Sequence, residues 1–220
     1  MKKVFKLIFN LLPTFIKDIY YRSVNKKANA KIILDWLEGG KPLPPPEIVK
    51  RQIISKISKE KNYDILIETG TYLGDMIFYQ LDNFNELYTI ELSDELYLKA
   101  VQRFKNQKKV HLLKGDSGII LNELMDSINQ SCVFWLDGHY SGVFKGVQTA
   151  KGEKDCPIYE ELTAIFKSNR NHFILIDDAR MFKGTNDYPT LEELYGFILS
   201  NKPLSKIHHE DDLIYIDLIN

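Results

Sequence analysis

The chain has 220 residues, of which 44% are apolar and 27% are charged, and its formal net charge is -1. This length suits one domain with a buried sheet, and the composition argues against a disordered chain and a strongly basic nucleic-acid binder. Two cysteines, Cys132 and Cys156, are too few for a disulfide framework and favour a reducing, cytoplasmic location.

Residues 1–46 are predicted to form an extension that precedes the main domain. Apolar residues recur at helical spacing from Val4 to Ile19 in a lysine-rich segment, which predicts a basic amphipathic helix within residues 1–22, bent at Pro13. No apolar run approaches the roughly 20 residues needed to cross a bilayer, and no signal-peptide cleavage site is evident. Such a helix could pack on its own domain, join two subunits of a homo-oligomer, lie peripherally on the inner face of a membrane, or be a mobile tail. Four prolines within 42–46 then predict an extended connector.

Residues 47–220 are predicted to form one α/β domain. Runs that are apolar throughout alternate with helical spacing, which predicts a Rossmann-like, doubly wound and mostly parallel sheet. Two last runs around an acidic turn predict a terminal antiparallel hairpin, and Thr190 with Glu193 predicts a capping box for the helix before it. The expected strands are 64–68, 87–91, 110–113, 133–136, 173–176, 206–209 and 213–218, and the main expected helices are 47–59, 75–81, 95–104 and 119–128.

The first predicted strand leads into the loop Glu-Thr-Gly-Thr-Tyr-Leu-Gly, residues 68–74. Ligands of open parallel sheets bind beyond the carboxyl ends of the strands, and Gly70 and Gly74 would allow a tight turn and a close helix start. A dinucleotide motif needs glycines where Glu68 and Leu73 stand. The Glu68 carboxylate would repel a pyrophosphate but suits an amino group and a sulfonium centre. An ordinary strand-turn-helix junction is the alternative.

Polar residues also follow the next two predicted strands. Glu91 lies about 20 residues beyond the loop, where an acidic side chain can accept hydrogen bonds from both ribose hydroxyls. A solvated acid at a strand end is the simpler explanation. Asp116 or Ser117 could contact an adenine amino group or only cap the following helix.

With these residues, the chain resembles the class I S-adenosylmethionine-dependent methyltransferases over residues 47–220, including the hairpin that completes their seven-stranded sheet. The loop is most similar to the E-x-G-x-Y-x-G loop of small metal-dependent O-methyltransferases, the catechol type included, which share a tyrosine at the place of Tyr72. The resemblance implies that the methionine part lies against Glu68 and Gly70, the ribose against Glu91, and the adenine beside Asp116 or Ser117. The cofactor-binding residues would be Glu68, Gly70, Thr71, Tyr72, Gly74, Glu91, Asp116 and Ser117.

Three aspartates follow the fourth and fifth predicted strands: Asp137, Asp177 and Asp178. Adjacent parallel strands would bring them together as an all-oxygen site that suits Mg²⁺. The catechol-type family and the similar bacterial sugar-tailoring enzymes place aspartates at the matching positions, which implies a metal that chelates a substrate hydroxyl and lowers its pKa. Alternatively, Asp178 only caps or pairs with Arg180, and Asp137 is a solvent-facing strand end.

His139 is the candidate general base, because an unperturbed pKa of ~6.5 leaves a histidine neutral near physiological pH. It could instead be a metal ligand or take no part in the chemistry, and the family places a lysine base slightly later, near Lys145. Residues 141–157 predict a substrate-binding loop. Its lysines 145, 151 and 154 would favour an anionic acceptor, or serve only solubility.

The sequence therefore predicts a Mg²⁺-assisted O-methyltransferase for a small or carbohydrate-like hydroxyl, such as one in surface polysaccharide or secondary-metabolite tailoring. Asp137 and His139 would be its catalytic residues. One alternative is a metal-independent methyltransferase that uses His139 as base. Another is a non-catalytic Rossmann-like scaffold that presents the N-terminal helix to a partner.

Overall fold

The computed structural model describes residues 14–139, 143–144, 147–148, 152 and 154–220. The chain divides into two compact units, Met1–Lys50 and Arg51–Asn220. The boundary between these units falls inside helix α3 (Glu47–Lys61), slightly later than the predicted division at Pro46. A separate role for the predicted extension stays a prediction.

The first unit contains one long helix, α2 (Thr14–Glu38). It continues well past the predicted helical segment of residues 1–22, and the part of that segment before Thr14, including Pro13, lies outside the described residues. Gly40 takes a φ of 78° after the helix, as is common at helix ends. Within the described part of the chain, no helix is long and apolar enough to cross a membrane.

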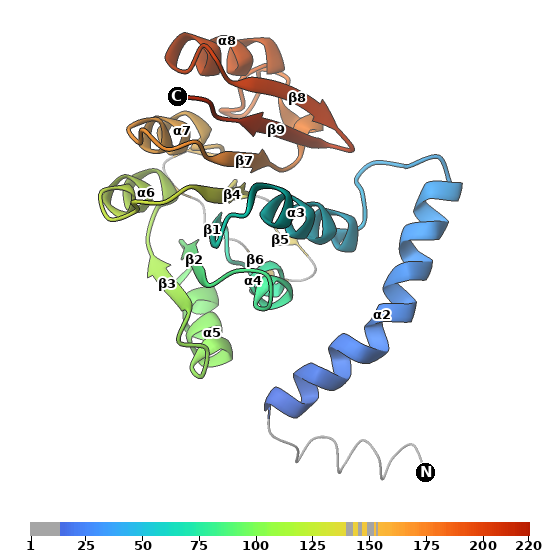
Figure 1. Ribbon diagram of the computed structural model, residues 1–220. Helices are drawn as coiled ribbons and strands as arrows, with labels where there is room; N and C mark the ends of the chain where they lie inside the picture. The colour runs from blue at the N-terminus through green and yellow to red at the C-terminus, as the bar shows by residue number, and fades with distance from the viewer. Residues whose placement is uncertain (1–13, 140–142, 145–146, 149–151, 153) are drawn as a thin grey trace, which may run out of the picture. The chain divides into compact units, whose positions relative to one another are not determined.

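The second unit is built on a seven-stranded sheet with the strand order β3-β2-β1-β4-β7-β9-β8 (Figure 1). The first five strands in this order are parallel, and β9 runs antiparallel to both β7 and β8. This arrangement confirms the predicted doubly wound sheet with its terminal hairpin. The strands are β1 (Ile65–Thr69), β2 (Glu86–Glu91), β3 (Val110–Lys114), β4 (Cys132–Leu136), β7 (Phe173–Ile176), β8 (Lys206–Glu210) and β9 (Leu213–Asp217).

Helices cover both faces of this sheet (Figure 1). Successive side chains of a strand point to opposite faces, so Leu66 packs in the core under α3, α4 and α5 while Ile67 packs in the core under α6, α7 and α8. Both are fully buried, which explains why successive residues in the middle of this central strand are apolar. The helices are α4 (Asp75–Gln80), α5 (Asp94–Phe104), α6 (Ser117–Met125), α7 (Ile158–Phe166) and α8 (Leu191–Asn201).

The region after β4 differs from the sequence prediction in two respects. The predicted loop contains a small antiparallel hairpin, β5 (Val143–Phe144) and β6 (Val147–Gln148), and it ends at helix α7. That helix follows Pro157 and buries Ile158, Leu162 and Ile165 on one face. Before the final hairpin, α8 begins at the predicted capping box, with both reciprocal hydrogen bonds present.

The strand order reverses between β1 and β4. From β1, the chain adds β2 and β3 on one side of the sheet, and β4 and β7 then extend the sheet on the other side. Open α/β sheets bind ligands in the crevice beyond the carboxyl ends of the strands at such a point. The predicted site residues lie in and around the segments that follow these strands.

Candidate active site

The loop after β1 needs glycine at two positions. Gly70 has a φ of 84°, and a Cβ atom there would overlap the main chain of Asp137 and lie 3.2 Å from Cα of Gly138. Gly74 has a φ of 75°, and its Cβ would lie 2.6 Å from the Phe104 ring. Both positions combine a left-handed backbone with a close neighbour, so glycine permits the turn and the helix start that follows it.

Glu91 at the end of β2 is fixed by the same loop. Tyr72 takes a φ of 49°, which is rare for an aromatic residue, and its N–H donates to Oε2 of Glu91 at 2.8 Å. The other carboxylate oxygen accepts from the N–H of Ser93 at 2.7 Å. Burial raises the pKa of Glu91, while the hydrogen bonds from Ser93 and Tyr72 oppose that shift. The carboxylate therefore has a fixed orientation next to the loop.

Glu68 ends a buried chain of hydrogen bonds. Its side chain is 2% exposed, and Oγ1 of Thr89 donates to its Oε2 at 2.5 Å. The Thr71 hydroxyl lies 2.6 Å from that of Thr89 and must be the donor there, because a hydroxyl donates only once. Burial raises the pKa of Glu68 well above its usual range, against the opposing effect of Thr89. A positive ligand group nearby would favour the ionised form.

Asp116 and Ser117 lie at the start of α6. Asp116 is the N-cap, and its Oδ1 accepts from the N–H of Gly118 at 3.0 Å, so the predicted capping role is present. A Cβ at Gly152 would lie 2.9 Å from Oδ2 of Asp116, which places the described part of the long loop directly against this residue. Ser117 is buried beside Glu161 of α7.

His139 lies between two of the predicted aspartates. Its Nδ1 is 3.5 Å from Oδ1 of Asp137, and its Nε2 is 3.1 Å from Oδ2 of Asp178. Burial lowers the pKa of His139, but the hydrogen bond with Asp178 and the charges of Asp137, Asp178 and Asp177 outweigh it and raise the pKa to about 9. Three carboxylates around the ring thus favour the imidazolium, in contrast to the neutral imidazole expected from the unperturbed pKa.

Asp178 also contacts a second positive group. Arg180 donates to its Oδ1 at 2.7 Å and also pairs with the buried Asp212. The ion pair foreseen as the alternative role of Asp178 is thus present. Asp177 follows β7, and its Oδ1 accepts from the N–H of Asp178 at 2.8 Å.

The predicted aspartates are brought to neighbouring strand ends, but not as a preformed metal centre. Among the described residues, no group of three or more His, Cys, Asp or Glu side chains is arranged to hold a metal ion. His139 and Arg180 already contribute positive charge to Asp137 and Asp178. In this arrangement the donor set does not fit Mg²⁺.

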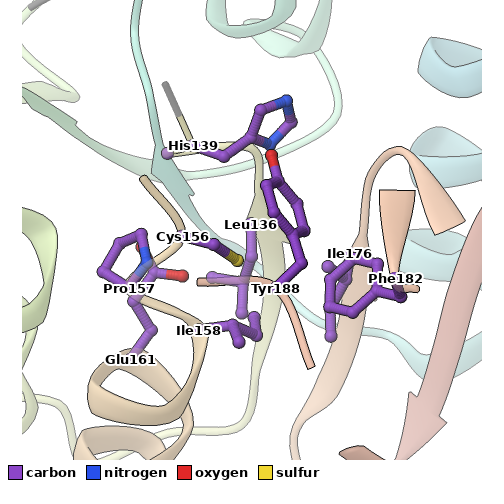
Figure 2. A pocket seen from close by; sticks show the side chains of 10 residues that line it. Leu136, His139, Cys156, Pro157, Ile158, Glu161, Ile176, Phe182 and Tyr188 are labelled. Carbon is purple, nitrogen blue, oxygen red and sulfur yellow. The ribbon is translucent and has the colours of Figure 1, made fainter. Parts of the chain in front are cut away.

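A small pocket lies beside His139, between the ends of β4 and β7 and the start of α7 (Figure 2). The Tyr188 ring meets the His139 ring edge to face, with centroids 5.8 Å apart. Glu161 points into the pocket from α7, and burial raises its pKa to about 7, against the effect of the nearby Ser117 and Thr69 hydroxyls. The lining residues are Leu136, Gly138, His139, Cys156, Pro157, Ile158, Glu161, Ile176, Phe182 and Tyr188.

Glu161 and Tyr188 were not among the site residues predicted from the sequence. A signal for Glu161 was present, because it stands three residues after Ile158 and next to Leu162, on the apolar face of α7. The loop lysines contribute little to the described site: Lys154 pairs with Glu160, while Lys145 and Lys151 lie outside the described residues. Burial raises the pKa of the Cys156 thiol to about 12, which does not suit a nucleophile.

Solved structures with the same fold are methyltransferases. The SAH-bound PaMTH1 of Podospora anserina is 15% identical, with a TM-score of 0.54 over 86% of this chain and 88% of that chain. The O-methyltransferase TomG of Streptomyces achromogenes, in complex with SAM, is 14% identical, with a TM-score of 0.54 over 92% and 95%. An O-methyltransferase of Bacillus cereus, in complex with SAH, is 12% identical, with a TM-score of 0.55 over 93% and 97%. No family model and no curated protein matches the chain.

Proposed function

We propose that this chain, which has the fold of class I S-adenosylmethionine-dependent methyltransferases, binds S-adenosylmethionine and transfers its methyl group to a hydroxyl oxygen. The observation that carries the proposal is the contact between the loop and Glu91: the Tyr72 N–H fixes a carboxylate beside the turn at Gly70. A carboxylate held at the end of the second strand can accept both ribose hydroxyls, as acidic residues do in other nucleotide-binding α/β folds.

The remaining cofactor roles follow from charge and position. Glu68 is a buried acid without a cation in hydrogen-bond contact among the described residues, and it suits the positive methionine part of the cofactor. Asp116 and Ser117, at the start of α6, would border the adenine. Thr71 orients Thr89 and thereby Glu68, while Gly74 lets α4 begin against the loop.

Methyl transfer depends mainly on the position of the acceptor oxygen relative to the methyl group. The sulfonium of S-adenosylmethionine already activates the methyl group, so the protein must align an acceptor oxygen with it and exclude water. We propose a small or carbohydrate-like acceptor bound over the ends of β4 and β7. Here His139 and Asp137 would orient the acceptor, and the imidazolium would donate a hydrogen bond instead of removing a proton.

A Mg²⁺-assisted reaction is the second candidate, supported by the convergence of Asp137, Asp177 and Asp178 at two neighbouring strand ends. A bound Mg²⁺ would supply a Lewis acid for the acceptor hydroxyl. Holding it would require these side chains to rearrange from their contacts with His139 and Arg180. Turnover that persists in EDTA would eliminate this candidate and leave metal-independent methyl transfer.

Isothermal calorimetry with S-adenosylhomocysteine tests the main proposal. We expect a single site per chain, with or without Mg²⁺. Absence of heat in both conditions, with a folded protein shown by circular dichroism, would remove the methyltransferase proposal and favour a non-catalytic scaffold.

We also propose a cytoplasmic location, in which the extension that contains α2 contacts a membrane surface or a second copy of the chain. Its support is the positively charged, partly apolar sequence of that helix. Sedimentation with anionic and neutral lipid vesicles, compared with the mass in solution, would separate membrane binding from dimerisation.

A further inference from the structure

Glu161 is a buried acid whose hydrogen bonding is incomplete. Its side chain is 2% exposed, and its Oε1 has no hydrogen-bond partner among the described residues. Oγ1 of Thr69, at the end of β1, is fully buried and has no partner at hydrogen-bond geometry within that part of the chain, yet it lies near enough to Glu161 to lower the pKa of its carboxyl group. Two incompletely bonded polar atoms therefore occur close together at the carboxyl end of β1.

Gly138 brings these two atoms together. A Cβ at Gly138 would lie 3.0 Å from Oε1 of Glu161 and 3.0 Å from Oγ1 of Thr69, so both oxygens approach its backbone. On its other side, Cα of Gly138 lies 3.2 Å from where a Cβ of Gly70 would be. Gly138 is thus the spacer between the proposed cofactor loop and Glu161.

A structural role does not explain a carboxyl group at this place. Glu161 shares its helix face with Ile158, Leu162 and Ile165, all buried against the sheet. Burying a polar group without a complete set of hydrogen bonds destabilises a protein. Perturbed acids in a pocket are common at functional sites, and here the pKa near 7 leaves Glu161 able to gain or lose a proton near neutral pH.

The pocket limits the chemistry of the group that can enter it. Its space is small, on the scale of a single water-sized group, and its walls at Leu136, Ile176 and Phe182 are apolar. An unsatisfied carboxylate oxygen requires a hydrogen-bond donor. An anion would be repelled by Glu161, and an ammonium group would lose hydration against the apolar walls. An uncharged hydroxyl satisfies these conditions.

We propose that this pocket receives an uncharged hydroxyl group of the methyl acceptor, and that Glu161 accepts its hydrogen bond and, during methyl transfer, its proton. The inference rests on the proposed function and names Glu161 as its base. The acceptor oxygen forms a bond to the methyl carbon and the carbon–sulfur bond of S-adenosylmethionine breaks, giving the neutral thioether. The hydroxyl proton passes to the Glu161 carboxylate, so charge and atoms balance.

Among the residues that the structure describes, four titratable groups face Glu161: Asp116 from the start of α6, His139 after β4, Cys156 before α7, and Tyr188 across the pocket. Asp116 raises its pKa and His139 lowers it. The pocket determines the charge of the entering group only, so the rest of the acceptor can carry any charge.

The test uses three probes with one ring and different charges: benzyl alcohol, benzoate and benzylamine. Their binding to the full chain is measured by ligand-observed NMR, with and without S-adenosylhomocysteine. We expect benzyl alcohol to bind, benzoate and benzylamine to bind at least ~10-fold more weakly, and Glu161→Leu to weaken benzyl alcohol binding ~10-fold, the range of one lost hydrogen bond. Glu123→Gln, an exposed acid on α6, is the matched control and should change nothing.

A second readout concerns the proton. In protein labelled with ¹³C at glutamate carboxyls, the resonance missing from Glu161→Gln should titrate near pH 7 and shift on addition of benzyl alcohol, whereas other carboxyl resonances should not shift. Equal benzyl alcohol binding by Glu161→Leu and the unchanged protein, or tighter binding of benzoate, would overturn the proposal. If S-adenosylhomocysteine does not bind while the probe results hold, the methyltransferase proposal fails and the hydroxyl-binding pocket remains.

Discussion

Gly70 and Asp137 touch through their main chains at the point where the sheet order reverses. A Cβ atom at Gly70 would lie 2.9 Å from the carbonyl carbon of Asp137 and closer still to its oxygen. The proposed cofactor loop after β1 and the proposed acceptor segment after β4 are therefore packed against each other. A change in the first should disturb the second.

Gly70→Ala should destabilise the protein and abolish S-adenosylhomocysteine binding. Alanine must adopt a φ of 84° and displace the Asp137 backbone, which we expect to lower the free energy of unfolding by ~2 kcal/mol or more. Urea unfolding and calorimetry measure the two effects. Gly196→Ala is the matched control, because nothing lies within 4 Å of its Cβ and it stands in α8, where alanine should stabilise slightly. Unchanged cofactor affinity in Gly70→Ala would contradict the proposed site.

Glu91→Ala should weaken S-adenosylhomocysteine binding by at least ~10-fold, since it removes charge-assisted hydrogen bonds worth ~1.5–3 kcal/mol each. It also frees the N–H groups of Tyr72 and Ser93. Glu95→Ala serves as the control: this exposed residue of α5 pairs only with Lys99 in the described contacts, so calorimetry should return the unchanged affinity. Equal affinities of both variants for S-adenosylhomocysteine would contradict the proposed contact between the ribose and Glu91.

The sequence was a good guide to the sheet and a poor guide to side-chain orientation. The apolar residues within 64–68 predicted a strand buried on both faces. The structure agrees, because Leu66 and Ile67 are buried on opposite faces of the sheet. Once the strands were predicted, the acidic residues that follow them could be assigned to the carboxyl ends of successive strands. Loop 68–74 was recognised from its two glycines and its resemblance to a known motif, and the structure shows a left-handed backbone and a close neighbour at both glycines.

The rest depended on tertiary contacts between segments distant in sequence. His139 was expected to be neutral from its unperturbed pKa of ~6.5, because the sequence does not show that its ring lies between Asp137 and Asp178. Glu161 was missed because the sequence shows an acid on an apolar helix face but does not show what lies opposite it, here Thr69 and Gly138. Helix α7 itself was overlooked for its short length and the glycine-rich loop before it.

Acid should destabilise the fold through His172. Burial lowers the pKa of His172 to about 4, with Lys202 and Arg170 adding to the shift. Its Nδ1 accepts from the N–H of Cys132 at 3.1 Å, so protonation breaks that bond. In the unfolded chain the pKa is ~6.5. The stabilisation is therefore complete above pH ~6.5 and is lost as the pH falls toward 4, at most ~3 kcal/mol over this window.

His172→Gln isolates this contribution. Its amide oxygen can still accept from Cys132, but it does not titrate. Urea unfolding at several pH values should show a smaller loss of stability between pH 6.5 and 4.5 for the variant than for the unchanged chain. His139 acts in the opposite direction: its pKa is raised to about 9, so its contribution to stability is complete below pH ~6.5 and is lost as the pH rises toward 9. Parallel pH profiles would refute the assignment to His172.

Thr89→Val should damage the site through Glu68. Valine keeps the shape of threonine but removes the donor to Glu68 and the acceptor for Thr71. Leaving a buried acid without its donor costs about 1–3 kcal/mol of stability, and the pKa of Glu68 should rise further because Thr89 holds it down. The protonated acid then attracts a sulfonium ligand less, so S-adenosylmethionine should lose more affinity than the uncharged thioether S-adenosylhomocysteine. Thr163→Val, at an exposed hydroxyl of α7 that bonds only its own helix in the described contacts, controls for the substitution. If the ratio of the affinities for S-adenosylmethionine and S-adenosylhomocysteine is the same in Thr89→Val and Thr163→Val, Glu68 does not face the sulfonium.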